Sequence, residues 1–307
     1  MEKKKIVTLA HYYTIKEVQQ MADKVGDSLE LALYAKNCNA DVIVFAGVRF
    51  MAETAKILNP NAKVILPDMN STCSLVTMTD ITKLRKWREE YQDYVHVAYI
   101  NSSAEHKALA DWTVTSRNVA DIINYLYKQG KKVIYSPDRN MGAYLNFEFG
   151  YNMPLWSAVC EVHDKFNKEA LDEMINDLKN PYHIIAHPES PLPVLKQSIY
   201  IGSTFGLLNW VKNFKGNSSD VILVATEDGI LYNMKLARPE LDIRQAPIYK
   251  GCQCNSCPYM KLNSIDALQK AINGDGGIEI DYLSDELIAK ARIPIDRMIN
   301  FSSIIED

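Results

Sequence analysis

Short apolar runs that end in polar clusters recur along the chain. They occupy residues 6–10, 97–100 and 184–186, and the polar clusters that follow begin at His11, Asn101 and His187. An uninterrupted apolar run of this length is typical of a strand buried in a parallel sheet. Each run therefore predicts a strand that delivers polar side chains to the carboxyl edge of a sheet.

Two further apolar segments follow each of these runs, with helical patterns between them. The segments are 41–47, 110–116 and 198–204, and then 63–68, 132–138 and 220–227. The helical pattern at 53–58 stops at Asn59-Pro60, and the pattern at 118–126 stops before Gly130. Strands that alternate with helices form right-handed crossovers in a parallel sheet covered by helices. The pattern therefore predicts an α/β fold.

The polar clusters recur at a nearly constant interval. His11, Asn101 and His187 lie 90 and 86 residues apart, and such a period is the mark of a repeated unit. A length of 307 residues alone predicts about two domains, but the repeat favours three. We expect three quasi-equivalent three-layer α/β/α domains with parallel sheets around a pseudo-threefold axis. Their predicted bounds are 1–80 completed by 258–307, 81–168, and 169–257.

Composition and charge exclude several classes of protein. The chain is 47% apolar and 23% charged with a net charge of −4, which excludes extensive disorder and gives no general attraction for nucleic acid or acidic membranes. The apolar run after the lysines at the N-terminus is too short for a signal peptide, and no run approaches the length of a membrane span. We therefore expect a cytoplasmic protein that binds neither nucleic acid nor membrane.

The six cysteines suggest metal binding or catalysis before disulfides in such a chain. The segment 252–257 has the pattern C-x-C-x2-C, which differs from a ferredoxin motif, and no second C-x2-C completes a zinc site. Cys73, Cys160 and Cys257 lie 87 and 97 residues apart, one in each predicted domain. Three equivalent loops with one cysteine each can meet on a pseudo-threefold axis. The alternative is that each is a small buried hydrophobic residue.

A series of ordered motifs then gives the chain a family resemblance. They are His11-Tyr12-Tyr13, residues 26–32, residues 42–60, Pro67-Asp68-Met69-Asn70-Ser71-Thr72-Cys73, Tyr99-Ile100-Asn101-Ser102-Ser103, Thr115-Ser116, Pro137-Asp138-Arg139-Asn140, Cys160-Glu161-Val162-His163, His187-Pro188-Glu189, Gly202-Ser203-Thr204 and Cys257-Pro258-Tyr259-Met260. With these motifs the chain resembles the quinolinate synthase family of bacterial NAD biosynthesis over essentially its whole length. It departs from the family pattern at Phe205, where glycine is common.

The resemblance implies a cofactor and a reaction. The cofactor is a [4Fe–4S] cluster held by Cys73, Cys160 and Cys257, with one iron left open as a Lewis acid. In the reaction, iminoaspartate condenses with dihydroxyacetone phosphate to give quinolinate, phosphate and two waters, which makes the enzyme a transferase. An aspartate oxidase or dehydrogenase is the implied source of iminoaspartate. Cys252 and Cys254 are expected to be redox residues or spectators.

Site roles also follow from the resemblance. Acid–base groups must surround the open iron because the condensation requires proton transfers. The catalytic candidates are Tyr13, Glu189, His187 and Tyr99, and the substrate-binding candidates are His11, Ser28, Asn101, Ser116, Ser203 and Thr204. His163 follows Cys160 by three residues and is expected to support the cluster. The three serines stand where helices are expected to begin, which suits an anionic substrate, although a serine at such a position is more often only a cap.

Two other functions are compatible with the same residues. One is a different iron–sulfur hydro-lyase of the aconitase type, which would act on hydroxyacids and ignore dihydroxyacetone phosphate. The other is a non-enzymatic iron–sulfur or thiol sensor, in which residues 252–257 would switch a partner surface. A sensor has no need of Tyr13 or of His187-Pro188-Glu189. Activity of single Cys→Ser variants discriminates these functions.

Overall fold

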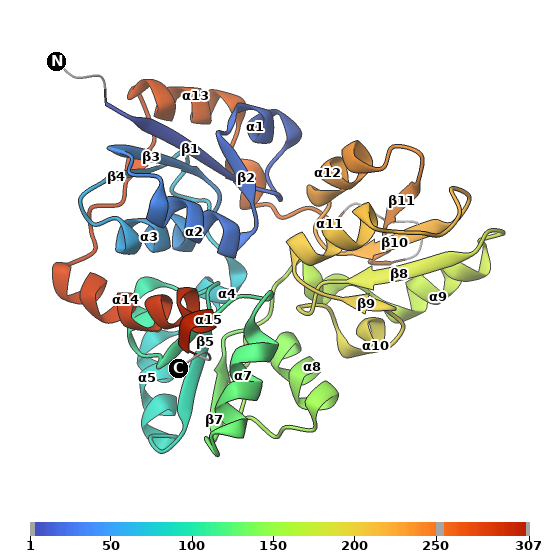
Figure 1. Ribbon diagram of the computed structural model, residues 1–307, viewed down its shortest axis with the longest axis horizontal. Coiled ribbons are helices and arrows are strands. Elements are labelled where there is room, and N and C mark those ends of the chain that lie inside the picture. Colours follow the sequence, from blue (N-terminus) through green and yellow to red (C-terminus); the bar gives the residue numbers. More distant parts are fainter. Residues whose placement is uncertain (1–3, 250–254, 305–307) are drawn as a thin grey trace.

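The computed structural model describes residues 4–249 and 255–304. Within these ranges the chain forms three sheets, which Figure 1 shows arranged around a common centre. The first sheet has the order β12-β4-β3-β1-β2. Its strands are β1 (Ile6–His11), β2 (Lys24–Gly26), β3 (Val42–Ala46), β4 (Lys63–Leu66) and β12 (Ile278–Glu279).

The second and third sheets are built in the same way. The second has the order β6-β5-β7, from β5 (Val95–Tyr99), β6 (Trp112–Val114) and β7 (Val133–Ser136). The third has the order β11-β10-β8-β9, from β8 (Tyr182–Ala186), β9 (Tyr200–Ile201), β10 (Val221–Ala225) and β11 (Asp242–Gln245). Neighbouring strands pair parallel throughout, except that β12 is antiparallel to β4. The predicted α/β fold with three parallel-dominated sheets is confirmed.

Register aligns the carboxyl ends of the central strands. Ala10 at the end of β1 lies opposite Ala46 of β3, and Ala186 at the end of β8 lies opposite Ala225 of β10. All five residues of β10 are buried, as its uninterrupted apolar sequence predicts. The residues that follow these strands therefore emerge together at one edge of each sheet.

The three sheets share one strand order. This order differs from the predicted equivalence of strands between the units. In each unit the first strand lies between the second and the third: β2-β1-β3, β6-β5-β7 and β9-β8-β10. The apolar pattern places β3 in the position of β6 and β9 because β2 has no apolar run of its own. That strand is only Lys24-Val25-Gly26 and has no apolar run, so its pairing with β1 depends on tertiary context.

Helices cover the sheets and join their strands. The α-helices are α1 (Lys16–Met21), α2 (Ser28–Asn37), α3 (Arg49–Leu58), α4 (Ser74–Thr77), α5 (Ile81–Glu90), α6 (Ala104–Ala108), α7 (Val119–Lys128), α8 (Arg139–Phe149), α9 (Lys168–Asn176), α10 (Leu192–Leu195), α11 (Thr204–Lys212), α12 (Ile230–Ala237), α13 (Ile265–Asn273), α14 (Asp285–Ile299) and α15 (Phe301–Ile304). The predicted helices at 53–58 and 118–126 correspond to α3 and α7. Gly130, just after α7, has a φ of 70°, which favours glycine and explains the stop.

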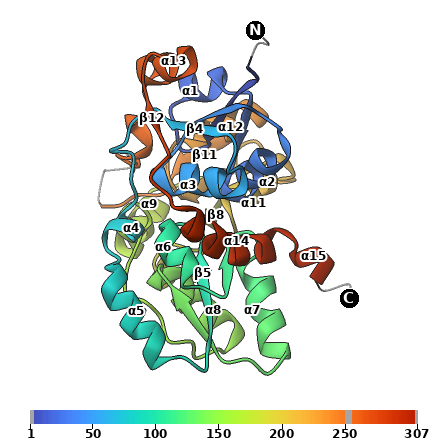
Figure 2. The same ribbon diagram turned by 90° about the vertical axis from the view of Figure 1, so that its left-hand side faces the viewer.

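The C-terminal segment contacts two of the units. Helix α13 packs beside α1, and β12 extends the first sheet. Helix α14 was expected to dock on the first unit, but it packs mainly against α6 and β6 of the second and also touches α3 of the first (Figure 2). The exact domain bounds remain a prediction. None of the helices in residues 4–249 and 255–304 combines the length and apolar character needed to cross a membrane.

Candidate active site

One cavity collects almost all of the predicted site residues. It encloses about 650 Å³ of empty space, counting its opening to solvent, where the carboxyl edges of the three sheets meet. Its walls include His11, Tyr13, Ser28, Cys73, Tyr99, Asn101, Ser116, Cys160, His187, Glu189, Thr204 and Cys257. Ser203 is the one predicted residue that does not line it. The three units therefore contribute jointly to a single site.

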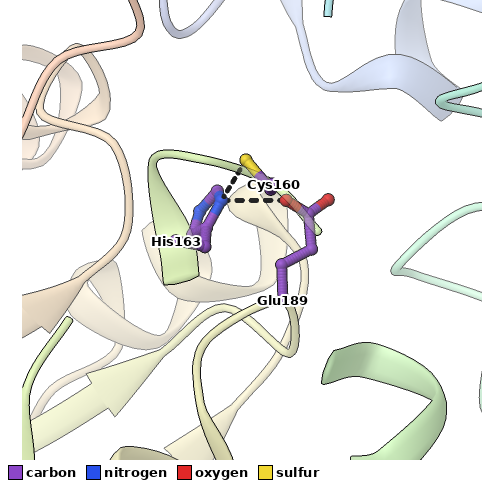
Figure 3. A group of neighbouring side chains, drawn as sticks. All are labelled: Cys160, His163 and Glu189. Carbon is purple, nitrogen blue, oxygen red and sulfur yellow. Dashed lines mark hydrogen bonds and ion pairs between the residues drawn. The ribbon is translucent and has the colours of Figure 1, made fainter. Parts of the chain in front are cut away.

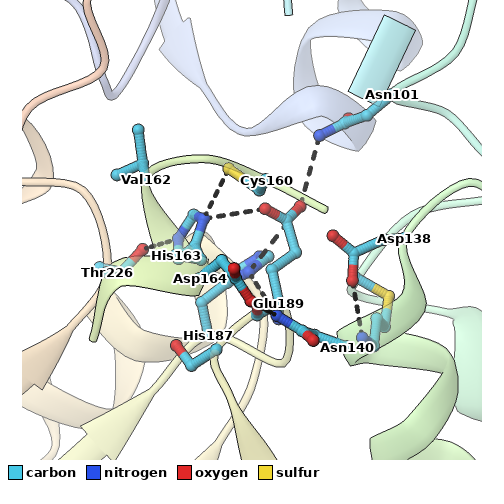
Figure 4. A network of polar contacts seen from close by, with 12 residues as sticks. Asn101, Asp138, Asn140, Cys160, Val162, His163, Asp164, His187, Glu189 and Thr226 are labelled. Atoms are coloured by element: carbon cyan, nitrogen blue, oxygen red, sulfur yellow. Dashed lines mark hydrogen bonds and ion pairs between the residues drawn. The ribbon is translucent and has the colours of Figure 1, made fainter. Parts of the chain in front are cut away.

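Glu189 lies at the centre of a polar network in this cavity (Figure 4). His163 Nδ1 is 2.8 Å from its Oε2 atom, and Asn101 Nδ2 donates to its Oε1 atom over 3.4 Å. The Asn140 amide donates to the Glu189 backbone carbonyl over 3.1 Å. Asn101 and Asn140 belong to the second unit and Glu189 to the third. Glu189 therefore connects these two units, through its carboxylate and its backbone carbonyl.

Burial and neighbouring groups set the charge of the site. Burial acts to raise the pKa of Glu189, but the nearby imidazoles of His163 and His187 outweigh it and hold that pKa below its ordinary value. Burial lowers the pKa of His187 to about 3 and that of His11 to about 4. At neutral pH the site therefore combines a carboxylate with two neutral imidazoles.

Tyr13 joins the first unit to the third. Its hydroxyl lies 2.8 Å from Thr204 Oγ1 and 2.8 Å from Thr226 Oγ1. Thr226 Oγ1 lies in turn 2.9 Å from His163 Nε2. Burial raises the pKa of Tyr13 well above its usual value, so the phenol keeps its proton at neutral pH.

Tyr99 is the second buried phenol of the cavity. Its hydroxyl interacts with the Glu189 carboxylate. Burial, followed by the charge of Glu189, raises the pKa of Tyr99 well above its usual value. Both phenols can therefore act as proton donors.

Cys73, Cys160 and Cys257 line the same cavity as free thiols. Burial raises the pKa of Cys257 to about 12 and also raises those of Cys73 and Cys160. The thiols are close enough for the charge of one to raise the pKa of another, as Cys257 does for Cys73. Cys252 and Cys254, whose roles were left open, lie outside the described residues.

Cys160 also belongs to a compact group that could hold a metal ion. Its sulfur, a ring nitrogen of His163 and a carboxylate oxygen of Glu189 all lie within 4.8 Å of one another (Figure 3). His163 Nδ1 is 3.2 Å from Cys160 Sγ. Sulfur, imidazole and carboxylate ligands together suit a transition metal.

The predicted serines do not all begin helices. Ser28 is the first residue of α2, but Asp27 is its N-cap, accepting from Glu30 N over 3.0 Å. Ser203 is the N-cap of α11 and accepts from Gly206 N over 3.1 Å, so its hydroxyl is occupied. Ser116 precedes Asn118, the N-cap of α7, by two residues. Ser28 and Ser116 nevertheless line the cavity.

Comparison with known proteins decides the family. A family model described as quinolinate synthetase A protein matches residues 1–300. The quinolinate synthase of Microcystis aeruginosa is 42% identical over 297 residues, covering 96% of this chain and 91% of that protein. The quinolinate synthase of Cyanophora paradoxa is 40% identical over 298 residues, covering 97% and 88%. This chain belongs to the quinolinate synthetase A family.

Two residues in or beside this quinolinate synthetase A cavity were not predicted from the sequence. Glu227 lines the cavity, and Thr226 contacts the lining residues Tyr13 and His163. Both residues follow β10, at the edge where polar residues also follow β1, β5 and β8. Glu227 is fully buried, and burial raises its pKa to about 8. A charged residue two positions after a strand of five apolar residues is the signal that could have found it.

Proposed function

We propose that the chain condenses iminoaspartate with dihydroxyacetone phosphate to give quinolinate, phosphate and two waters, as a transferase of NAD biosynthesis. The observation that carries the proposal is the single cavity in which one cysteine from each unit meets Tyr13, Tyr99 and Glu189. Family membership supports the same reaction. Both substrates are anions. His11 and His187 are neutral at neutral pH, so they do not repel these anions as carboxylates at the same positions would.

The residues fit a [4Fe–4S] cluster as cofactor. Cys73, Cys160 and Cys257 are soft ligands that line one cavity, and burial together with mutual repulsion keeps them protonated in the absence of a cation. Three thiols are one fewer than the four that usually hold such a cluster. When bound, the cluster would supply an iron with an open position that acts as a Lewis acid.

Tyr13, Tyr99 and Glu189 are the proposed acid–base groups. At neutral pH Glu189 is ionised and can accept a proton from carbon, whereas the two phenols keep their protons and can donate to a departing hydroxyl. Asn101 orients the Glu189 carboxylate through its 3.4 Å hydrogen bond. The ring Nδ1 atom of neutral His187 carries no proton, because it accepts a hydrogen bond from the Glu189 backbone N–H over 3.4 Å. His187 therefore cannot donate a proton from this atom.

Substrate carboxylates and phosphate are proposed to bind at the hydroxyls of Ser28, Ser116 and Thr204, one from each unit, with His11 beside them. All four residues line the cavity. Helix α2 begins at Ser28 and α11 at Thr204, so free backbone N–H groups accompany these hydroxyls. Ser203 is not retained as a direct contact, because its hydroxyl caps α11.

An anaerobic product assay tests the proposal. The chain purified without oxygen is incubated with dihydroxyacetone phosphate and iminoaspartate generated in the mixture, and quinolinate is measured by chromatography. Iron and sulfide are measured on the same sample, and about four of each per chain are expected. Turnover of hydroxyacids without quinolinate would instead favour an aconitase-type hydro-lyase.

Single Cys→Ser variants provide the matched controls. Changes at 73, 160 or 257 should abolish quinolinate formation and remove most of the iron, whereas Cys38→Ser should keep both. Cys38 is a suitable control because its thiol donates to Ala35 O over 3.3 Å and is not part of the cavity wall. Full activity of Cys73→Ser or Cys160→Ser would contradict the proposed cofactor.

A further inference from the structure

Arg117 connects all three units beside the cavity. It follows β6 in the second unit, and its Nη2 atom lies 2.7 Å from Asp27 Oδ2 and 3.6 Å from Glu30 Oε2 of the first unit. Its guanidinium carbon lies 3.9 Å from the ring centroid of Phe205, in α11 of the third unit. We call Arg117, Asp27, Glu30 and Phe205 the Arg117 junction. Its members come from the three units but meet at one point.

Each unit contributes to the junction from the same place in its fold. Asp27 follows β2, Arg117 follows β6 and Phe205 follows β9, and these are the equivalent second strands of the three sheets. The junction is therefore built on the pseudo-threefold arrangement of the chain.

In each unit, one residue of the Arg117 junction is adjacent in the sequence to a serine or threonine that lines the cavity. Asp27 precedes Ser28, Arg117 follows Ser116, and Phe205 follows Thr204. These are the hydroxyls proposed above to bind the substrate anions, and all three line the cavity. A displacement of any junction member must therefore move the hydroxyl beside it.

The junction is rigid where it meets α2. Asp27 is only 5% exposed and forms a capping box with Glu30, in which each side chain accepts from the backbone N–H of the other residue. The Tyr12 hydroxyl also donates to Glu30 Oε2 over 3.3 Å. A guanidinium that pairs with a buried carboxylate and stacks on an aromatic ring has a defined position, which a lysine cannot reproduce.

We infer that Arg117 is a positioning residue for substrate binding, which holds Ser28, Ser116 and Thr204 at the spacing that the two anionic substrates require. The inference rests on the proposed function for the identity of the substrates. Phe205 gives the junction its contact with the third unit through its aromatic ring. Arg117 does not line the cavity itself and acts through its neighbours.

The test compares Arg117→Ala, Arg117→Lys and Phe205→Leu with Arg244→Ala in the anaerobically prepared holoenzyme. Arg244 is a matched control because it pairs with Asp242 at 2.5 Å within β11, the edge strand of the third sheet, and does not line the cavity. Arg117→Ala should raise KM for at least one substrate about 10-fold while kcat changes less than about 3-fold and iron content is unchanged. Arg117→Lys should recover part of the affinity, and Arg244→Ala should match the parent chain.

Hydrogen exchange supplies a readout that does not depend on activity. Amides in the first turns of α2 and α11 should exchange about 10-fold faster in Arg117→Ala, and less so in Phe205→Leu, while Arg244→Ala leaves them unchanged. Unchanged KM values with unchanged exchange would overturn the inference, as would loss of kcat and iron at constant KM. If the parent chain forms no quinolinate, the proposed function fails, and the exchange measurement alone then decides whether Arg117 holds the two helix starts.

Discussion

Tyr13 and Glu189 are connected by a chain of close polar contacts that passes through Thr226 and His163. The Tyr13 hydroxyl lies 2.8 Å from Thr226 Oγ1, Thr226 Oγ1 lies 2.9 Å from His163 Nε2, and His163 Nδ1 lies 2.8 Å from Glu189 Oε2. The two strongest acid–base candidates, 176 positions apart in the sequence, therefore belong to one network. Each link in this chain can be removed separately.

Thr226→Val removes the middle hydroxyl while keeping the shape of the side chain. We expect kcat for quinolinate formation to fall about 10-fold or more, because Tyr13 and His163 lose their shared partner. Thr113→Val is the control, since Thr113 Oγ1 is buried and finds no hydrogen-bond partner among the described residues. That variant should keep full activity. Equal activity of the two variants would show that the hydroxyl of Thr226 has no role in turnover.

Tyr13→Phe removes the phenol but keeps the ring. We expect a loss of about 100-fold in kcat, with a cost of only about 1 kcal/mol in the free energy of unfolding. Tyr282→Phe provides the comparison, because the Tyr282 hydroxyl donates to Glu53 Oε1 over 2.7 Å outside the cavity wall. It should lose comparable stability in urea titrations while retaining its turnover. The proposed role of Tyr13 fails if both variants turn over alike.

Lys261→Met should destabilise the fold. Lys261 Nζ lies 2.8 Å from Glu227 Oε1 and 3.0 Å from Asp228 Oδ1, and the Glu227 carboxylate is fully buried. At pH 9, above the pKa of about 8 that burial gives Glu227, removal of the ammonium leaves a buried carboxylate without its cation, which costs about 3 kcal/mol. Lys290→Met, which breaks an exposed pair with Glu286, should cost less than about 0.5 kcal/mol. Urea unfolding of both variants measures the difference, and similar losses would contradict it.

His96 should make the fold sensitive to acid. Its Nε2 atom and that of His106 each lie 2.7 Å from Ser136 Oγ, and its Nδ1 atom lies 3.2 Å from the Leu109 carbonyl. Burial lowers the pKa of His96 to about 4 and also lowers that of His106. The unfolded chain therefore binds more protons than the folded chain between pH 4 and about 6.5, and stability present above pH 6.5 is lost as the pH falls through that range.

A comparison with His96→Asn measures this contribution. The charged groups that act on His96 are Arg88, which lowers its pKa, and Asp111, which raises it, and both stay in place. Between pH 7.5 and pH 5, the parent chain should lose about 2 kcal/mol more than the variant in urea unfolding. His11 and His187 titrate in both proteins, so their effects cancel in the difference. Equal slopes of stability against pH would rule out His96 as a source of acid sensitivity.

Much of the fold could be predicted because the central strand of each sheet contains a short apolar run. The runs before His11, Asn101 and His187 became β1, β5 and β8, each the central strand between its unit's second and third strands. The strand β2 has no such run, and Lys24-Val25-Gly26 pairs with β1 only because the surrounding fold holds it there. The position of α14 was equally hidden, because its apolar face does not specify which unit it covers.

The site was predictable where polar residues follow apolar strands, and not where its geometry depends on contacts between units. Tyr13, Glu189 and the three cysteines were expected to converge, and all line one cavity. The contact of Thr226 with both Tyr13 and His163 joins residues from separate parts of the chain and has no local signature. The capping role of Ser203 was also open, because a serine before a helix suits either a cap or an anion.

The shared cavity makes catalysis more fragile than folding. The strands of each sheet pair only with one another, so a sheet can stay paired while its unit shifts slightly against its neighbours. A relative movement of about 1 Å would nevertheless stretch the 2.8 Å contacts of the Tyr13 hydroxyl beyond hydrogen-bond range. Such a movement would lower the rate of turnover without a corresponding change in the melting temperature.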